Sequence, residues 1–267
     1  MTAQAAWSGG GKVRVGCSGF VYKHWRGGVF YPEKWPVRRE LEFYATQFET
    51  VELNNPFYHL PPRSTFEKWK AGTPAGFDFA VKASRLITHL KRLHDCGEAL
   101  DLFLDHAAGL GRKLGPILFQ FPARWDLHLD RLRAFLSLLP RRLSFAFEFR
   151  HASWFQPEVY RALEHAGAGL CLPVSPALPE PPLVATSPLI YLRLHAGHGR
   201  DGNFEDDELR LWARRMHGLM RQAQQGYAFF NNDWQGLAPR NARTFRHMLG
   251  GDFPAIRYNL FSAYGPA

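Results

Sequence analysis

Eight short apolar segments of strand length recur along this chain, and stretches with helical spacing separate most of them. The segments cover residues 13–17, 50–54, 77–82, 116–121, 144–150, 169–172, 189–195 and 227–232. Between them, apolar residues three and four positions apart indicate amphipathic helices, as at Leu132, Phe135 and Leu136. Such alternation favours a parallel sheet with right-handed crossovers. Eight strand–helix units in roughly 250 residues predict an α/β fold, a single (β/α)8 TIM-like barrel.

The sixth of these units departs from the pattern. Residues 173–188 are rich in proline, which predicts a loop where a helix would normally lie. A doubly wound open sheet is the alternative fold, but no GxGxxG motif follows the first strand, so its commonest functional signature is missing. The predicted organisation is a flexible N-terminal tail over residues 1–11 and a single barrel domain over residues 12–267.

Composition narrows the class of protein and its location. Apolar residues make up 46% of the chain, enough for a sizeable core. No stretch approaches the ~18 apolar residues of a membrane span, and residues 1–11 lack a signal-peptide pattern. The three cysteines lie far apart with no CxxC motif. We therefore expect a cytoplasmic protein with no membrane partner, and the net charge of +9 favours anionic partners.

Several strands are apolar on one face and end in a charged or amide residue on the other. Within residues 144–150, Phe145 and Phe147 point one way while Glu148 and Arg150 point the other. Active sites of such barrels lie at the carboxyl ends of the strands. The polar residues at or just beyond those ends are Glu52, Asn54, Lys82, Gln120, Glu148, Arg150, Arg193, His195, Asn231 and Asp233. We expect them to form one site; the alternative is an internal ion-pair network without chemistry.

Glu52 and Glu148 are expected to face each other across the barrel mouth, because their strands are three apart. Two such carboxyl groups can divide acid and base work between them. A glycosidase is one version of this chemistry, with aromatic side chains as sugar platforms. The candidates for those platforms are Trp25, Tyr58, Trp154 and Trp234.

Metal binding and nucleophilic catalysis are weaker alternatives. The candidate ligands for Mg²⁺ or Mn²⁺ are Glu52, Glu148, His195 and Asp233. No local ligand spacing supports them, and Lys82 and Arg150 nearby would repel a cation, so a divalent metal is not favoured. Cys17 also ends a strand and His24 could act as its base, but a small buried cysteine is the commoner outcome.

The basic residues at the strand ends favour an anionic ligand at the barrel mouth. Together, Lys82, Arg150, Arg193 and His195 would create a positive mouth suited to phosphate or carboxylate. The glycine-containing residues 196–203 follow the seventh strand, and the loops after strands seven and eight often bind phosphate in these barrels.

The ordered motifs of the chain give a further indication. They are Gly16-Cys17-Ser18-Gly19, Tyr22-Lys23-His24-Trp25-Arg26-Gly27, Thr50-Val51-Glu52-Leu53-Asn54, Phe79-Ala80-Val81-Lys82-Ala83, Ile87-Thr88-His89, Phe119-Gln120-Phe121-Pro122, Phe147-Glu148-Phe149-Arg150-His151, Tyr191-Leu192-Arg193-Leu194-His195 and Phe230-Asn231-Asn232-Asp233. With these motifs the chain resembles the domain of unknown function 72 family, from Val13 to about Leu249.

The resemblance implies a (β/α)8 barrel and no particular activity. Its motif residues coincide with the polar strand ends. Two departures stand out: Phe20 and Val21 replace an aromatic and a small polar residue, and residues 172–176 lack an expected acidic residue.

We expect an enzyme that carries out acid–base or hydrolytic chemistry on a small phosphorylated or otherwise anionic substrate. Glu148 is the first choice for general acid or base, and the other predicted catalytic residues are Glu52, His195 and Asp233. The predicted substrate-binding residues are Asn54, Lys82, Gln120, Arg150, Arg193, Asn231, Asn232, Tyr58, His24 and Trp25. Nucleic-acid binding or processing, and non-catalytic ligand binding, stay as alternatives. Cofactor and oligomeric state are left open.

Overall fold

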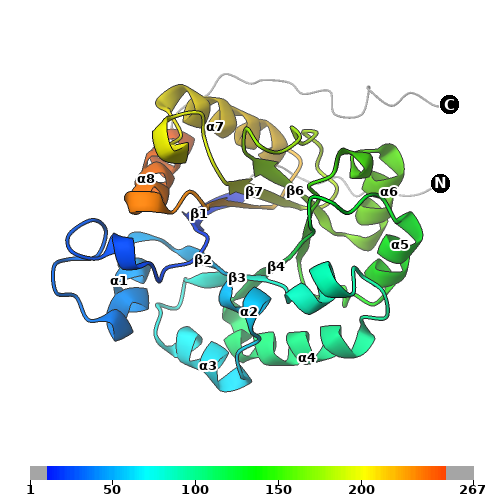
Figure 1. The fold of residues 1–267 in the computed structure, drawn as a ribbon, viewed down its shortest axis with the longest axis horizontal. Helices are drawn as coiled ribbons and strands as arrows, with labels where there is room; N and C mark the ends of the chain where they lie inside the picture. Colours follow the sequence, from blue (N-terminus) through cyan, green and yellow to red (C-terminus); the bar gives the residue numbers. More distant parts are fainter. Residues whose placement is uncertain (1–10, 251–267) are drawn as a thin grey trace.

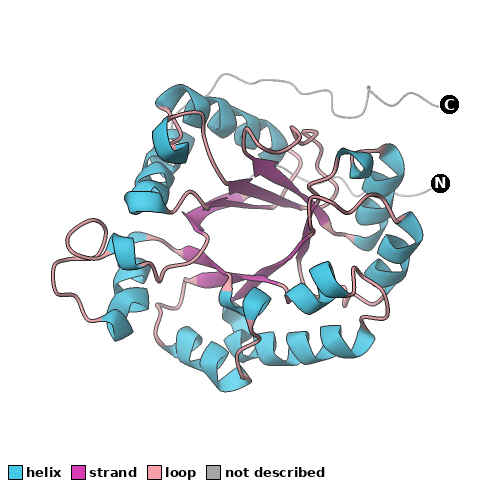
Figure 2. Ribbon diagram, in the orientation of Figure 1, coloured by secondary structure: helices cyan, strands magenta, loops and turns pink. Residues whose placement is uncertain are grey.

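Eight parallel strands form the centre of the protein, and α-helices surround them (Figures 1 and 2). The computed structural model describes residues 11–250, so most of the predicted tail and residues 251–267 of the predicted barrel domain lie outside the described residues. The strands are β1 (Lys12–Cys17), β2 (Thr50–Leu53), β3 (Asp78–Lys82), β4 (Leu114–Gln120), β5 (Phe145–Glu148), β6 (Gly169–Val174), β7 (Leu189–Leu194) and β8 (Gln225–Phe230). Their spatial order, β1-β8-β7-β6-β5-β4-β3-β2, confirms the predicted TIM-like barrel.

The α-helices lie between successive strands in the chain, except for the last one, which follows β8. They are α1 (Glu40–Gln47), α2 (Asn55–Tyr58), α3 (Arg63–Ala71), α4 (Gly97–Ala107), α5 (Leu129–Ser137), α6 (Pro157–Ala166), α7 (Asp206–Met220) and α8 (Leu237–Leu249). The predicted apolar stripe of α5 is buried, as at Leu132 and Phe135. No α-helix lies between β6 and β7 in the described chain, which confirms the irregular sixth unit.

The barrel is closed between β1 and β2 by a side chain as well as by backbone pairing. Among the described residues, a single isolated bridge joins Ser18, directly after β1, to Glu52 of β2. Gly16 allows a close approach, because a Cβ there would lie 2.2 Å from the carbonyl oxygen of Thr50. The Tyr44 hydroxyl of α1 accepts a hydrogen bond from the Cys17 amide over 2.7 Å and donates to the Thr50 carbonyl over 3.1 Å. A side chain of helix α1 therefore provides hydrogen-bond partners for backbone groups of β1 and β2 that do not pair with each other.

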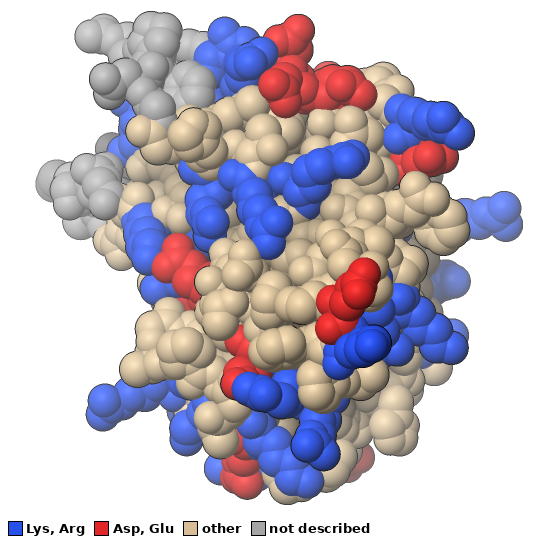
Figure 3. Space-filling model, turned by 90° about the vertical axis from the view of Figure 1, so that its left-hand side faces the viewer, with Lys and Arg blue, Asp and Glu red and all other residues tan. Residues whose placement is uncertain are grey.

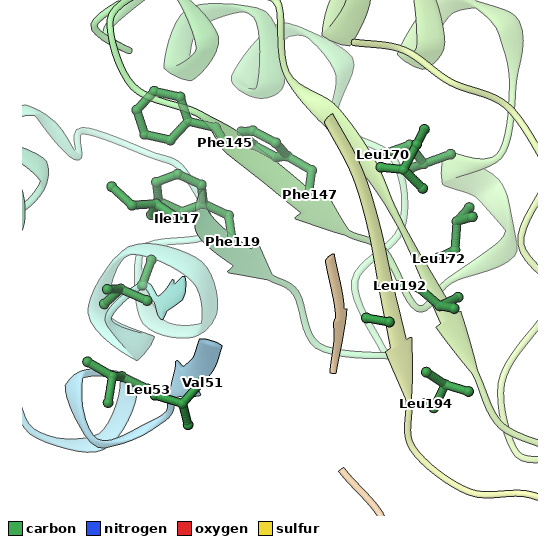
Figure 4. Close-up of a cluster of buried hydrophobic side chains, with 14 of the residues drawn as sticks. Val51, Leu53, Ile117, Phe119, Phe145, Phe147, Leu170, Leu172, Leu192 and Leu194 are labelled. Carbon is green, nitrogen blue, oxygen red and sulfur yellow. The ribbon is translucent and has the colours of Figure 1, made fainter. Parts of the chain in front are cut away.

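Alternate side chains of the strands enter two separate apolar layers. Outward-facing residues such as Phe147 pack between the sheet and the helices (Figure 4). Inward-facing residues fill the barrel centre, and they are Ala80, Leu118, Ala146, Cys171, Leu189, Tyr191, Tyr227 and Phe229. Because every second residue faces the same way, Glu148 follows Ala146 into the barrel and Arg193 follows Tyr191. The inward row thus turns from apolar to charged at the carboxyl ends of the strands.

Charged side chains of both signs are spread over the face that carries α1 and α8 (Figure 3). On α8, Arg243 and Arg246 donate hydrogen bonds to Gln47 of α1, so part of this positive charge also joins two helices. None of the helices within residues 11–250 is both long enough and apolar enough to cross a membrane.

Candidate active site at the barrel mouth

A cavity of ≈ 760 Å³ lies at the carboxyl ends of the strands. The predicted site residues that line it are Asn54, Tyr58, Lys82, Gln120, Arg150, Arg193, His195, Asn231 and Asp233. The barrel brings these side chains together from six strands or the loops that follow them, because parallel strands end at one edge of the barrel. The described lining does not include Glu52, Glu148, His24, Trp25 or Asn232.

The floor of the cavity is a buried charge network centred on Arg193. Its Nη2 donates to Glu52 Oε1 and its Nη1 donates to Glu148 Oε2, each over 2.7 Å. Tyr191 donates to the second oxygen of Glu52, also over 2.7 Å. Both carboxylates are fully buried. The two predicted acid–base residues therefore lie beneath the lining, with their oxygens engaged by the protein.

Opposite charges keep this network ionised. Burial on its own would raise the pKa of Glu148, but the charges of Arg193 and Arg150 and the hydrogen bond with His195 hold that pKa well below its usual value. The Arg193 pKa is raised well above its usual value, because Glu52 and Glu148 outweigh the effect of burial. A carboxyl group that stays ionised cannot donate a proton at neutral pH. The geometry therefore suits Glu148 to positioning other groups rather than to general acid catalysis.

His195 and Arg150 connect the floor with the cavity. Arg150 Nε donates to Glu148 Oε1 over 2.7 Å, and Arg150 Nη2 lies 3.3 Å from His195 Nε2. His195 Nε2 is 3.3 Å from Glu148 Oε1, while Asn231 Nδ2 lies 3.2 Å from His195 Nδ1. Burial lowers the pKa of His195 more than Glu148 raises it. His195 is therefore a neutral imidazole at neutral pH, oriented by a carboxylate and an amide.

Lys82 is a cation without a carboxylate partner in the described structure. It ends β3 with 8% of its surface exposed, and its Nζ lies 3.8 Å from the centre of the Phe57 ring. Its pKa is lowered to about 7, mainly by burial and then by Arg193, against the opposing effects of Glu148 and Glu52. An amine with this pKa changes its charge near neutrality, unlike an ordinary lysine.

The rim of the cavity joins the loops after β1 and β8. His24 Nε2 lies 3.3 Å from the Asp233 carboxylate, and Trp25 Nε1 donates to the Asp233 carbonyl over 2.7 Å. Trp25 is fully buried and absent from the described lining, so its role in substrate binding stays a prediction. It anchors the rim because its ring packs in the core. Tyr58 is the exposed aromatic of the rim, with 73% of its surface accessible.

The four predicted amides divide into two groups. Asn54, Gln120 and Asn231 line the cavity. Asn232 is buried and donates hydrogen bonds to the Gly202 carbonyl and to Asn241 Oδ1, so in the described structure it joins two loops, and its contact with substrate stays a prediction. The reason is local: successive residues after a strand point in different directions, and only one of the pair can face the mouth.

The described structure is less favourable for nucleophilic catalysis by Cys17, for phosphate binding by residues 196–203 and for metal binding. Burial raises the pKa of Cys17, which keeps this fully buried thiol protonated and unsuited to act as a nucleophile. Residues 196–203 are absent from the described lining of the cavity. Within residues 11–250, no three or more His, Cys, Asp or Glu side chains are grouped so as to hold a metal ion.

Sequence reasoning did not select several residues of the described lining, among them Phe57 and His89. Burial, together with Lys82 and Arg150, lowers the pKa of His89 to about 4. His89 lies in a helical turn (Leu86–Leu90) beyond β3, and its ring packs edge-on against Phe57 at 4.9 Å. Strand-end reasoning does not reach such loop residues. The Ile87-Thr88-His89 motif was the signal that could have identified His89.

Comparisons with known proteins agree with this architecture. The UPF0759 protein YunF of Bacillus subtilis (strain 168) is 27% identical over 262 residues, which cover 85% of this chain and 92% of that protein. The crystal structure of a DUF72 family protein from Thermotoga maritima MSB8 matches with a TM-score of 0.81 at 30% identity, over 90% of this chain and 99% of that one. A DUF72 family protein from Enterococcus faecalis V583 shares the fold, with a TM-score of 0.75 at 21% identity over 91% and 97% of the two chains.

The match to a family model is equally extensive. The model described as "Protein of unknown function DUF72" covers residues 14–260, which include all eight strands after the first two residues of β1. The motifs that carried the resemblance lie at the strand ends and in the loops around the cavity. From this match and the similar folds, we conclude that the chain belongs to the DUF72 family.

Proposed function

We propose that the cavity at the barrel mouth is the active site of an enzyme for a small phosphorylated or otherwise anionic substrate. The observation that carries this proposal is the charge of the lining. Lys82, Arg150 and Arg193 converge on it, while Asp233 is the acidic side chain among the described lining residues. Positive side chains in a recessed site attract anions and hold them with charge-assisted hydrogen bonds.

The buried network leaves a positive charge available for a ligand. Glu52 and Glu148 already pair with Arg193, and Arg150 pairs with Glu148, so these four charges balance. Lys82 is then the additional cation whenever its amine is protonated. An anion bound beside Lys82 would favour that protonated form, since an opposite charge stabilises it.

His195 is the group best placed to move a proton in this site. It lines the cavity, and burial keeps it neutral. Glu148, Arg150 and Arg193 all lie within 3.5 Å of His195 Nε2. We propose that the carboxylate holds the proton on Nε2, and Nδ1 is then the acceptor that faces Asn231. A substrate group that displaces the Asn231 amide would meet a proton acceptor. We therefore assign acid–base or hydrolytic chemistry to His195, with Glu148 as its positioning residue.

A thermal-shift and activity screen tests this proposal. Sulfate, inorganic phosphate, sugar phosphates and short oligonucleotides are added to the wild-type protein and to the Lys82→Met and His195→Gln variants. Lys68→Met on the surface of α3 is the matched control. A ligand present at 100 times its Kd stabilises the native state by about 2.7 kcal/mol, which raises the Tm by ~5–10 °C for a chain of this size.

We expect stabilisation by anions in wild type and Lys68→Met, a smaller shift in Lys82→Met, and loss of turnover in His195→Gln with anion binding kept. The absence of any shift with these anions would contradict the proposal. Strong stabilisation by oligonucleotides alone, with a steep dependence on salt, would instead support the nucleic-acid alternative. Binding without turnover of any anion would favour non-catalytic ligand binding.

A further inference from the structure

The Lys82 amine occupies an unusual environment for a lysine in a charged cavity. Its Nζ lies over the face of the Phe57 ring, and in residues 11–250 it forms no ion pair with a carboxylate. The two nearby carboxylates cannot turn toward it without breaking their own contacts. Glu52 is held by Arg193 and Tyr191, and Glu148 by Arg193 and Arg150.

Charged residues on or after β2, β5 and β7 affect the pKa of Lys82. Arg193 and Arg150 disfavour its protonated form, Glu148 and Glu52 favour it, and burial acts with the two arginines. His89 also lies in the lining, where burial and then Lys82 and Arg150 keep it neutral. As a result, a large share of the amine is uncharged at neutral pH. For an exposed lysine this share is below ~0.1% at pH 7.

An uncharged amine in a cavity is a nucleophile toward carbonyl carbon. Lysines become reactive in this way when they are desolvated or lie beside another cation. Lys82 satisfies both conditions, and it lines the same cavity as Arg150 and His195. The cavity therefore combines an amine nucleophile, a fixed cation for an anionic group, and a neutral imidazole.

We propose that Lys82 forms a Schiff base with a substrate that carries both a carbonyl group and an anionic group, such as a 2-oxo acid or a keto-sugar phosphate. This inference rests on the proposed function and names its substrate class. The Nζ lone pair forms the new bond to the carbonyl carbon, and a proton passes from the nitrogen to the carbonyl oxygen, which becomes a hydroxyl. With one proton from solvent, that hydroxyl leaves as water and a C=N⁺ bond forms. The positively charged iminium acidifies the adjacent carbon, and His195 in the lining of the same cavity would accept its proton.

Reductive trapping tests this step directly. The folded wild-type protein is incubated at neutral pH with pyruvate or with dihydroxyacetone phosphate in the presence of sodium cyanoborohydride. Intact mass and peptide mapping then locate the secondary amine that the reduction leaves. The same treatment is applied to Lys82→Met and Lys82→Arg, and to Lys68→Met as the control for a surface lysine. Lys82→Arg keeps a cation in the cavity but cannot form the adduct.

We expect one adduct per chain with at least one probe, at the peptide that contains Lys82, formed at least tenfold faster than at other lysines. It should be absent from both Lys82 variants, retained in Lys68→Met and slowed by excess sulfate. Labelling that is spread over surface lysines, or no adduct at Lys82 with either probe, overturns the inference. If sulfate still stabilises the protein in that case, the proposed function stands without the Schiff base. If sulfate has no effect either, both fail.

Discussion

The guanidinium of Arg193 lies 2.7 Å from the carboxylate of Glu148, and both side chains are buried at the bottom of the barrel mouth. Arg193 makes a second contact of the same length with Glu52 on the far side of the barrel. One guanidinium thus links strands β2, β5 and β7 by charge. Removing one member of such a buried network is costly, because it leaves an uncompensated charge behind.

The first prediction concerns this network. Arg193→Met leaves Glu52 and Glu148 without their shared partner, and we expect the free energy of unfolding to fall by about 3–5 kcal/mol or more. Urea denaturation measures the change. Arg161→Met, which breaks the exposed pair with Glu158, is the matched control and should cost at most ~1 kcal/mol. Equal effects of the two substitutions would show that the central network contributes little to stability.

Glu148 should control the protonation of His195. In Glu148→Gln the carboxylate that raises the pKa of His195 is lost while burial stays, so we expect that pKa to fall further below its usual value. NMR titration of the histidine rings measures this, with Glu158→Gln on the surface of α6 as control. An unchanged His195 pKa in folded Glu148→Gln would remove Glu148 as a positioning residue.

Lys82 should make stability depend on pH. Its pKa is lowered from 10.5 to about 7 in the folded state, so between these values the unfolded chain binds more protons than the folded chain. Stability from this group therefore rises with pH above about 7. Lys82→Met should remove the rise. The difference in unfolding free energy between wild type and Lys82→Met, measured from pH 6 to 8.5, isolates it from other groups. A difference that is flat over this range would contradict the lowered pKa.

The Tyr44 hydroxyl should contribute to closing the barrel. In Tyr44→Phe the ring can stay in place, but the Cys17 amide and the Thr50 carbonyl lose their buried partner. We expect a loss of about 1–3 kcal/mol in unfolding free energy and faster hydrogen exchange in the peptide that contains Cys17. Tyr58→Phe at the exposed rim should change stability by no more than ~0.5 kcal/mol. Equal stabilities would mean that backbone pairing alone closes the barrel.

The sequence predicted the barrel well because its signal is local. Alternation along β5 separates Phe147 from Glu148 within the chain itself, and eight such strands allow few other folds. Alternation along a strand could not predict whether a polar residue lines the cavity or is buried beneath it. Glu52 and Glu148 lie under the cavity because Arg193, more than 40 residues further along, pairs with both.

Contacts between loops were the other feature that the sequence pattern could not predict. Trp25 is buried because it packs beneath the loop that contains Asp233, 208 residues away. Phe57 and His89 reach the cavity from helical turns that follow strands, where the alternation rule no longer applies. The sequence pattern therefore located the mouth and its charge, whereas the division into floor, lining and rim required the structure.

Calorimetry with sulfate tests the central claim, that Lys82 and the arginines of the mouth bind an anion, most directly. Sulfate keeps its charge near neutrality, so titrations at about pH 7.5 in buffers of different ionisation enthalpy report protons taken up by the protein. We predict saturable binding at one site with net proton uptake, because the anion raises the pKa of Lys82, and loss of that uptake in Lys82→Met but not in Lys68→Met. Wild-type protein that binds no sulfate, or binds it with the same proton uptake after Lys82→Met, would contradict the account.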